Sequence, residues 1–232
     1  LLPQTLPTFS TLEMRAVSAP ALEVGGDYYD IALLDEHRVG IVIGDVSGKG
    51  VGAAFYMAEM KGIFQSLSKI HSSPKQFLVK ANESLLSSLD KRSFISLIYA
   101  VLDVVTGDLV VSRAGHCPML YATSSSIKYI TPTGMGLGLS GGKLFEDSLE
   151  EKGIVMKEGD ICVFYTDGVT ESRSASGEEF GYERLMKVVE EKRLSSAEDI
   201  KEEIIQRVWS YTDAQGYDDD LTVFVVKWSG AH

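Results

Sequence analysis

Four short aspartate-bearing segments, each at the edge of an apolar run, constrain the fold of this chain more than any other feature. They are residues 25–30 (GGDYYD), 44–50 (GDVSGKG), 166–171 (TDGVTE) and 217–222 (YDDDLT). Short apolar runs bounded by glycine and polar residues are typical of strands, so each segment brings a carboxylate to a strand end. Carboxylates at close range repel unless a cation neutralises them, and hard divalent cations prefer oxygen ligands. The pattern therefore predicts a binuclear Mg²⁺ or Mn²⁺ site built from both ends of the chain.

Size and charge narrow the class of protein. The chain has 232 residues, 44% of them hydrophobic, and a formal net charge of −11. These values predict one globular domain and argue against nucleic acid or an anionic membrane as the main partner. No apolar run has the length of a membrane span, and Cys117 and Cys162 lack a CxxC partner. We expect a cytoplasmic domain, residues 11–232, preceded by a linker (1–10) from an upstream sensory region that is itself cytosolic or membrane-bound.

Hydrophobic periodicity predicts an α+β fold in which strands and helices form separate groups. The expected strands are 12–19, 28–34, 39–44, 94–103, 109–113, 119–122, 127–130, 161–166 and 221–228. One helix is expected from Val51, and a second follows Ser73, with Gln76 closing a capping box. Two more are expected over 182–192 and after a Ser195-x-x-Glu198 capping box, whereas residues 131–142 look like loop.

Two glycine-rich segments invite a nucleotide-binding interpretation and do not support it. Residues 44–50 have three residues between the first glycine and Gly-Lys, where a P-loop needs four and then Ser or Thr. Residues 134–138 lack the spacing of a dinucleotide fingerprint and fit a turn better. Any single Asp-Gly pair is more often a turn than a ligand. Four of them beside buried strands favour the metal site.

Five motifs in order along the chain give a specific resemblance. The four aspartate segments, together with residues 114–118 (AGHCP), resemble the SpoIIE/RsbU branch of the metal-dependent PPM serine/threonine phosphatases. The resemblance covers nearly the whole chain. It implies an αββα sandwich of two antiparallel sheets flanked by helices.

The same resemblance implies a set of metal ligands for two Mn²⁺ or Mg²⁺ ions. Asp45 would bridge both ions, and the backbone carbonyl of Val46 would complete one site. Asp27 would serve one ion, and Asp167 and Asp219 would serve the other. These ligands would act in catalysis through a metal-activated water, without a cysteine or serine nucleophile.

Neighbouring acidic residues are expected to support the ligands. Asp30 and Asp218 are alternates that we assign to supporting positions, and Asp220 stands where the wider superfamily usually has Asn. His116 fits a structural turn better than a catalytic role, because turn chemistry also explains its glycine and proline neighbours.

Two helper residues of the wider superfamily are absent. The sequence reads Asp45-Val46-Ser47 where many relatives have Asp-Gly-His, so a histidine general acid is missing there. The arginine that often grips phosphate before the first acidic motif is missing as well, and Arg15 or Lys49 would have to substitute. Both departures are usual for the SpoIIE/RsbU branch, which leaves water in the metal site as the proton source.

The resemblance also implies a substrate, namely a phosphorylated STAS-domain anti-anti-sigma factor in bacterial partner switching. Homodimerisation through the helices is compatible with the family. We expect the helix from Val51, which directly follows Asp45, to gate metal binding under the control of an upstream segment. Two alternatives stay open: a catalytically silent PPM-like binding or sensing module, and a nucleotide-binding or cyclase-type domain.

Overall fold

The computed structural model describes residues 1–23, 25–48, 50–71, 73–90, 92–212 and 219–230. The chain forms two compact units, each built on one antiparallel five-stranded sheet. The first unit comprises Leu1–Thr5, Val24–Pro118 and Thr131–Met156, and the second comprises Leu6–Glu23, Met119–Ile130 and Lys157–His232. Both units are therefore discontinuous in sequence.

The sheet of the first unit has the strand order β2-β3-β4-β5-β8. Its strands are β2 (Asp27–Leu33), β3 (Arg38–Val46), β4 (Ile95–Asp103), β5 (Asp108–Ala114) and β8 (Glu151–Val155). In β3, successive residues from Val39 to Gly44 are buried on both faces of the sheet. A strand buried on both faces has a continuous apolar sequence, which explains why apolar and polar residues do not alternate in this segment.

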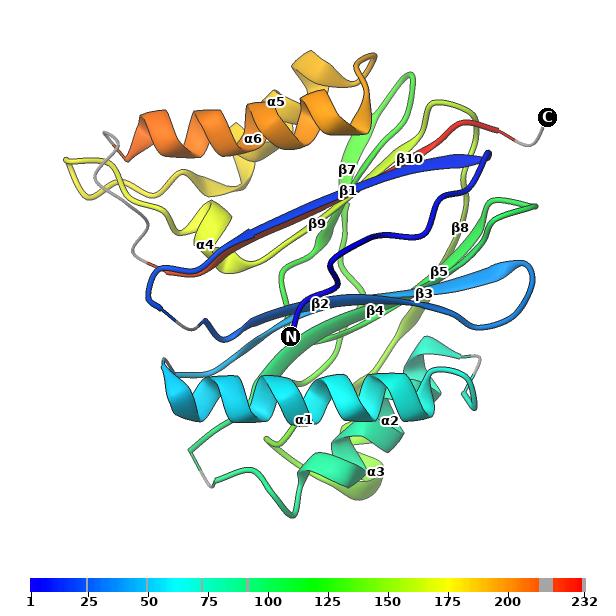
Figure 1. Cartoon of the computed structure of the whole chain (residues 1–232), viewed down its shortest axis with the longest axis vertical. Coiled ribbons are helices and arrows are strands. Elements are labelled where there is room, and N and C mark those ends of the chain that lie inside the picture. The colour runs from blue at the N-terminus through cyan, green and yellow to red at the C-terminus, as the bar shows by residue number, and fades with distance from the viewer. Residues whose placement is uncertain (24, 49, 72, 91, 213–218, 231–232) are drawn as a thin grey trace. The chain divides into compact units, whose positions relative to one another are not determined.

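Three helices cover one face of this sheet (Figure 1): α1 (Val51–Leu67), α2 (Pro74–Leu85) and α3 (Gly142–Ser148). Helix α1 buries Ala53, Met57, Met60 and Phe64, which recur every three or four residues. The Phe64 ring lies 6.0 Å from Phe77 of α2 and 5.9 Å from Tyr99 of β4, between ring centroids. These edge-on aromatic contacts fix both helices on the sheet.

The sheet of the second unit has the strand order β1-β10-β9-β6-β7. Its strands are β1 (Leu12–Ala19), β10 (Leu221–Trp228), β9 (Ile161–Tyr165), β6 (Met119–Ala122) and β7 (Ile127–Ile130). The central strands β9 and β10 are buried along almost their whole length. The first and last strands of the sequence, β1 and β10, are paired residue by residue from Leu12↔Trp228 to Ala19↔Leu221.

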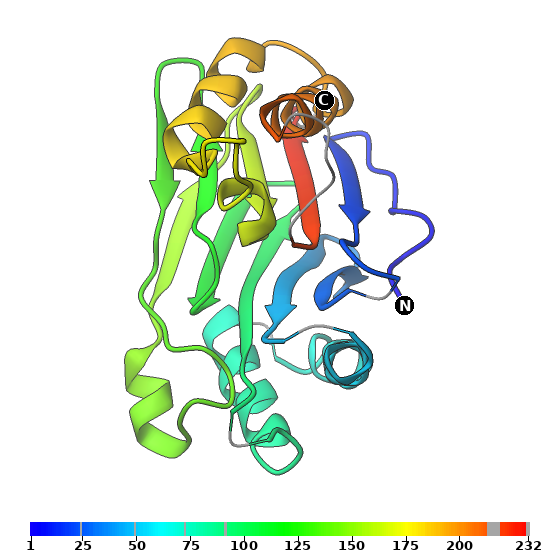
Figure 2. The same cartoon turned by 90° about the vertical axis from the view of Figure 1, so that its left-hand side faces the viewer.

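Three helices belong to the second unit: α4 (Asp167–Thr170), α5 (Gly181–Lys192) and α6 (Ala197–Tyr211). Figure 2 shows α5 and α6 side by side over one face of this sheet. Helix α5 buries Leu185, Val188 and Val189. Helix α6 buries Ile200, Ile204 and Val208, the residues that its periodicity predicts.

The structure confirms the α+β class and every expected strand to within a residue or two. It adds α3, β8 and α4, which the sequence did not predict. One helix start was wrong by a residue, because Ser196 rather than Ser195 is the N-cap of α6 and forms its capping box with Asp199. The Ser73 hydroxyl caps α2 by accepting from the Gln76 backbone, which confirms the expected N-cap. The capping box expected from Gln76 is not completed, since among the described residues its side chain forms no bond to the Ser73 backbone. None of the helices in the described part of the chain is long and apolar enough to cross a membrane.

Candidate metal centre

Two of the predicted ligands face each other in the first unit. Asp27 begins β2, and its register partner on β3 is Asp45. Directly opposed residues share one face of a sheet, with Cβ atoms about 4.5–5.5 Å apart. Asp27 is buried and Asp45 is half-buried. Two negative carboxylates at this range repel each other, so the pair is suited to a cation.

The carbonyl of Val46 turns toward the same place. The Val46 N–H donates to the Gly26 carbonyl at 3.2 Å, which closes the chain around Gly26. A Cβ atom at Gly26 would lie 2.9 Å from the Val46 carbonyl oxygen and 3.1 Å from Asp45 Oδ1. The absence of a side chain at Gly26 thus leaves a small space bordered by these two oxygen atoms and by the Ala53 methyl group at 3.4 Å. Oxygen donors converging on such a space fit Mg²⁺ or Mn²⁺.

Ser96 extends this row across a third strand, and sequence reasoning missed it. It is the register partner of Asp45 on β4. Its hydroxyl is 2.7 Å from Nδ1 of His116, which is buried. His116 thus packs behind the row of Asp27, Asp45 and Ser96, in agreement with a structural role. Only the strand pairing, which the sequence does not specify, reveals this connection.

Asp30 lies apart from the row and has its own partners. Its carboxylate accepts from Lys61 Nζ on α1 at 3.1 Å, from the Tyr28 hydroxyl at 3.1 Å and from the Ile31 backbone at 2.9 Å. Burial, and then the charge of Asp30, raises the pKa of Tyr28, so this phenol remains a donor. Asp30 therefore serves to hold α1 on β2.

The other two predicted ligands lie in the second unit, at the ends of neighbouring strands. Asp167 follows β9 and begins α4, while Asp219 precedes β10. Thr166 joins the two strand ends, since its N–H donates to the Thr222 carbonyl at 3.1 Å and its hydroxyl accepts from the Thr222 N–H at 2.9 Å.

Gly168 fixes the contact between these two strand ends. A Cβ atom there would lie 2.0 Å from the Asp220 carbonyl oxygen, which leaves no room for any other residue. The backbone after Asp167 therefore packs directly on the backbone after Asp219. The predicted ligands thus form two pairs, one in each unit.

Glu171 is a third acidic residue close to Asp167 and Asp219. The sequence motifs did not single it out. Partial desolvation raises the pKa of its carboxyl, and the negative charges of Asp167 and Asp219 act in the same direction. Glu171 therefore lies within electrostatic range of Asp167 and Asp219. The sequence signal for Glu171 is its position four residues after Asp167, which is one helical turn away.

The remaining predicted residues have varied outcomes. Asp220 Oδ1 accepts from the Ala21 backbone at 2.8 Å, which fits the expected polar support. Arg15 forms an ion pair with Glu198 at 3.0 Å, so nothing directs it toward a phosphate. Asp218 and Lys49 lie outside the described residues. Among the described residues, no group of three or more His, Cys, Asp and Glu side chains is arranged to hold a metal ion.

Comparison with known proteins decides the family. The family profile of Stage II sporulation protein E (SpoIIE) matches residues 35–229. The chain belongs to the SpoIIE family. It is 32% identical to Protein IcfG of Synechocystis sp. over 97% of this chain and 39% of that protein. It is also 32% identical to the phosphoserine phosphatase RsbU of Bacillus subtilis, over 98% of this chain and 66% of RsbU. The SpoIIE-family chain therefore spans only part of either relative.

Solved structures share the fold of this SpoIIE-family chain. The PP2C phosphatase domain of SpoIIE from Bacillus subtilis superposes with a TM-score of 0.80 at 18% identity, covering 93% of this chain and 63% of that one. The catalytic domain of the phosphatase PstP, in complex with two manganese ions, gives a TM-score of 0.65 at 12% identity, covering 94% and 98%. The fold predicted from the PPM resemblance, with two antiparallel sheets flanked by helices, is thereby confirmed.

Proposed function

We propose that this chain is a metal-dependent phosphoserine/phosphothreonine protein phosphatase. One observation carries the proposal, namely the opposed pair of Asp27 and Asp45 with the Val46 carbonyl turned over Gly26. Carboxylate and carbonyl oxygens that converge in this way are the ligands a hard divalent cation prefers. Membership of the SpoIIE family, together with 32% identity to a phosphoserine phosphatase, supports phosphate ester hydrolysis as the reaction.

Each predicted ligand has a distinct role in this proposal. Asp27, Asp45 and the Val46 carbonyl would hold a divalent cation in the first unit, and Asp167 and Asp219 would hold one in the second. When bound, Mn²⁺ or Mg²⁺ supplies Lewis-acid activation of water and neutralises the phosphoryl charge. The protein contributes positioning, because strand pairing holds Asp27 opposite Asp45 before any substrate arrives.

No protein nucleophile is needed in this scheme. Cys162 is fully enclosed, and burial, followed by the charge of Asp160, raises the pKa of its thiol. A thiol kept protonated in this way does not attack phosphorus. Direct attack by water is therefore the route that we propose, with water also protonating the leaving group.

The proposed substrate is a phosphorylated STAS-domain anti-anti-sigma factor. RsbU, a phosphoserine phosphatase, supports a phosphoserine protein as the substrate class. We also propose that the chain works in the cytoplasm, receives its signal from an upstream sensory segment in cis, and pairs as a homodimer. The net charge of −11 speaks against nucleic acid as a partner.

The alternative of a catalytically silent binding module predicts loss of at least one metal carboxylate. Asp27, Asp45, Asp167 and Asp219 are all present, which favours the enzyme. The nucleotide-binding alternative requires a phosphate-gripping loop, and neither glycine-rich segment has the spacing for one.

The proposal is tested by phosphate release from a phosphoserine-containing STAS protein with and without Mn²⁺. We expect turnover that requires Mn²⁺ and is lost in Asp219→Asn. The matched variant is Asp220→Asn, which removes a neighbouring charge but keeps an oxygen to accept from Ala21. Metal-independent turnover, or an active Asp219→Asn protein, would reject the assignment.

A further inference from the structure

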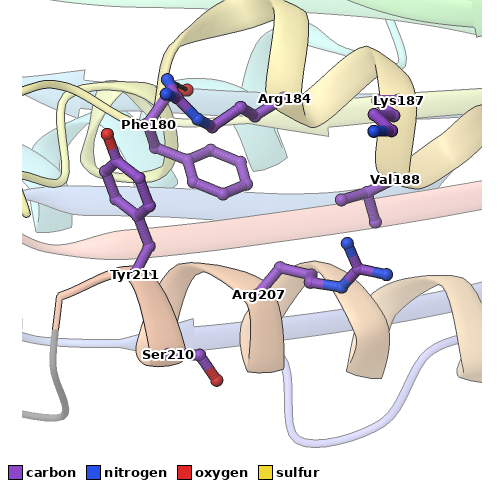
Figure 3. Close-up of a pocket in the computed structure, with 7 residues that line it drawn as sticks. All are labelled: Phe180, Arg184, Lys187, Val188, Arg207, Ser210 and Tyr211. Carbon is purple, nitrogen blue, oxygen red and sulfur yellow. Dashed lines mark hydrogen bonds between the residues drawn. The ribbon is translucent and has the colours of Figure 1, made fainter.

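A cavity of about 380 Å³ lies between α5 and α6 in the second unit (Figure 3). The two arginines that border it, Arg184 and Arg207, are already paired with glutamates. Phe180 and Val188, which also line it, are almost completely buried. These contacts pack α5 against α6 and point to no ligand. Ser47, next to the proposed metal ligands of the first unit, has contacts with a clearer functional meaning.

Two hydrogen bonds join Ser47 to Phe94, the residue before β4. The Ser47 N–H donates to the Phe94 carbonyl at 3.0 Å, and the Ser47 hydroxyl accepts from the Phe94 N–H at 2.8 Å. In a regular antiparallel ladder, a hydrogen-bonded pair exchanges two backbone bonds, so here the hydroxyl of Ser47 takes the place of its own carbonyl. The strand pairing therefore ends at Ser47 with the Phe94 N–H satisfied, and the chain turns at Gly48, where φ is 98°.

Phe94 is a firm anchor for these bonds because the residue after it is held on two sides. Ile95 is the register partner of Val46. It also exchanges two backbone hydrogen bonds with Leu137, at 3.0 and 2.9 Å, and both residues are buried. Backbone bonds in such buried contacts open less readily than exposed ones. The backbone that Ser47 contacts is therefore part of the rigid body of the first unit.

The bond from the Ser47 N–H also sets the direction of the Val46 carbonyl. The two groups belong to one peptide unit, which is planar and trans, so they point in opposite directions. Strand β3 lies between β2 and β4, and the N–H points to Phe94 on the β4 side. The Val46 oxygen is thereby directed to the β2 side, where it would lie 2.9 Å from a Cβ atom at Gly26. This is the carbonyl that the proposed metal centre uses.

We propose that Ser47 is a positioning residue, whose hydroxyl bond to Phe94 holds the Val46 carbonyl in the direction of the bound cation. The inference rests on the proposed phosphatase function and adds to it a role for the residue that stands where many relatives have histidine. In this role the hydroxyl acts through the backbone and touches neither the substrate nor the cation. A serine suits it because its short side chain reaches backbone groups beside its own.

The test compares Ser47→Ala with Ser47→Thr by calorimetric titration of Mn²⁺ into the whole chain. Ser47→Ala removes the acceptor of the Phe94 N–H, and we expect Mn²⁺ to bind about tenfold more weakly. Ser47→Thr keeps a hydroxyl and is expected to bind Mn²⁺ like the wild type. The matched control is Ser73→Ala, which removes the hydroxyl acceptor of the Gln76 N–H at the start of α2. It should leave the Mn²⁺ affinity unchanged.

Amide hydrogen exchange of the metal-free proteins checks the contact itself. We expect the Phe94 N–H to exchange about tenfold faster in Ser47→Ala than in the wild type, and at the wild-type rate in Ser47→Thr. Wild-type Mn²⁺ affinity in Ser47→Ala would overturn the proposal, as would an unchanged exchange rate of the Phe94 N–H. An equal loss of affinity in Ser47→Thr and Ser47→Ala would also overturn it, because the hydroxyl would then not be the group that matters.

Hydrolysis of p-nitrophenyl phosphate with Mn²⁺, measured on the same proteins, separates this inference from the proposed function. A wild type that binds Mn²⁺ without hydrolysing the ester would contradict the phosphatase, whereas the titrations would still decide the role of Ser47. A wild type that binds no Mn²⁺ would overturn both.

Discussion

Lys61 on α1 forms an ion pair with Asp30 on β2, with Nζ and Oδ2 3.1 Å apart. The Asp30 side chain is only 7% exposed and that of Lys61 is 24% exposed, so the pair is largely shielded from water. Helix α1 begins five residues after Val46, and β2 begins with Asp27. The ion pair therefore ties the helix to the strand that carries one proposed ligand. A shift of α1 along β2 would disturb Asp27 and Asp45 together.

Removing the charge of Lys61 tests this tie. In Lys61→Met the Asp30 carboxylate keeps its burial but loses its cation, and we expect a loss of about 2 kcal/mol in the free energy of unfolding. Urea unfolding measures this change. Lys69→Met, at an exposed position just beyond α1, is the control and should leave stability unchanged. Equal midpoints for Lys61→Met and the wild type would show that the pair does not hold the helix.

The space at Gly26 is the second point to test. In Gly26→Ala the new Cβ would press on the Val46 carbonyl at 2.9 Å and on Asp45 Oδ1 at 3.1 Å. We expect Mn²⁺ affinity to fall by about tenfold, measured by calorimetric titration. Gly52→Ala on α1 is the control, because a Cβ there meets nothing within 4 Å. Unchanged Mn²⁺ affinity in Gly26→Ala would place the metal elsewhere.

The turn between β4 and β5 predicts a specific pH dependence of stability. Hydrogen bonds from the Thr106 and Val105 N–H groups hold the pKa of Asp103 below its usual value. Because the pKa of Asp103 is lower in the folded state, the unfolded chain takes up this proton at a higher pH than the folded protein does. The stabilisation is therefore present above the ordinary Asp pKa of about 3.9 and is lost as the pH falls through the lower folded value.

In Asp103→Asn this acid-dependent contribution should disappear. We expect stability, measured by urea unfolding, to fall less steeply between about pH 5 and pH 2 than in the wild type. Asp147→Asn removes an equal charge from exposed α3 without removing these hydrogen bonds, and should keep the wild-type slope. If the Asp103→Asn and wild-type slopes coincide, the turn carboxylate makes no such contribution.

Most helices and strands could be predicted because the spacing of apolar residues in the sequence matches the pattern of buried residues in the structure. Helix α1 presents Met57, Met60 and Phe64 at helical spacing, and β9 is apolar along its whole length. Helix α3 and strand β8 were missed for a physical reason. Strand β8 (EKGIV) has no fully buried residue and does not alternate apolar with polar residues, and Phe145 is the one buried side chain of α3, so neither gives a strong periodic signal.

Candidate ligands could be named from the sequence, but their arrangement could not. The motifs identified Asp27, Asp45, Asp167 and Asp219. Strand register and close backbone approach decide which of them face each other, and a single sequence does not specify either. Ser96 illustrates this limit, because only pairing of β4 with β3 brings it opposite Asp45.

The central claim is that the Asp27–Asp45 pair binds a catalytic divalent ion. Its most direct test is to count Mn²⁺ bound per chain by electron paramagnetic resonance of free Mn²⁺, in the wild type and in Asp45→Asn, alongside p-nitrophenyl phosphate hydrolysis. We predict two bound ions in the wild type and fewer in Asp45→Asn. Hydrolysis should fall by at least about a hundredfold, since even outer-shell partners of a metal contribute 10–100-fold. Equal Mn²⁺ binding and equal hydrolysis in the two proteins would contradict the claim.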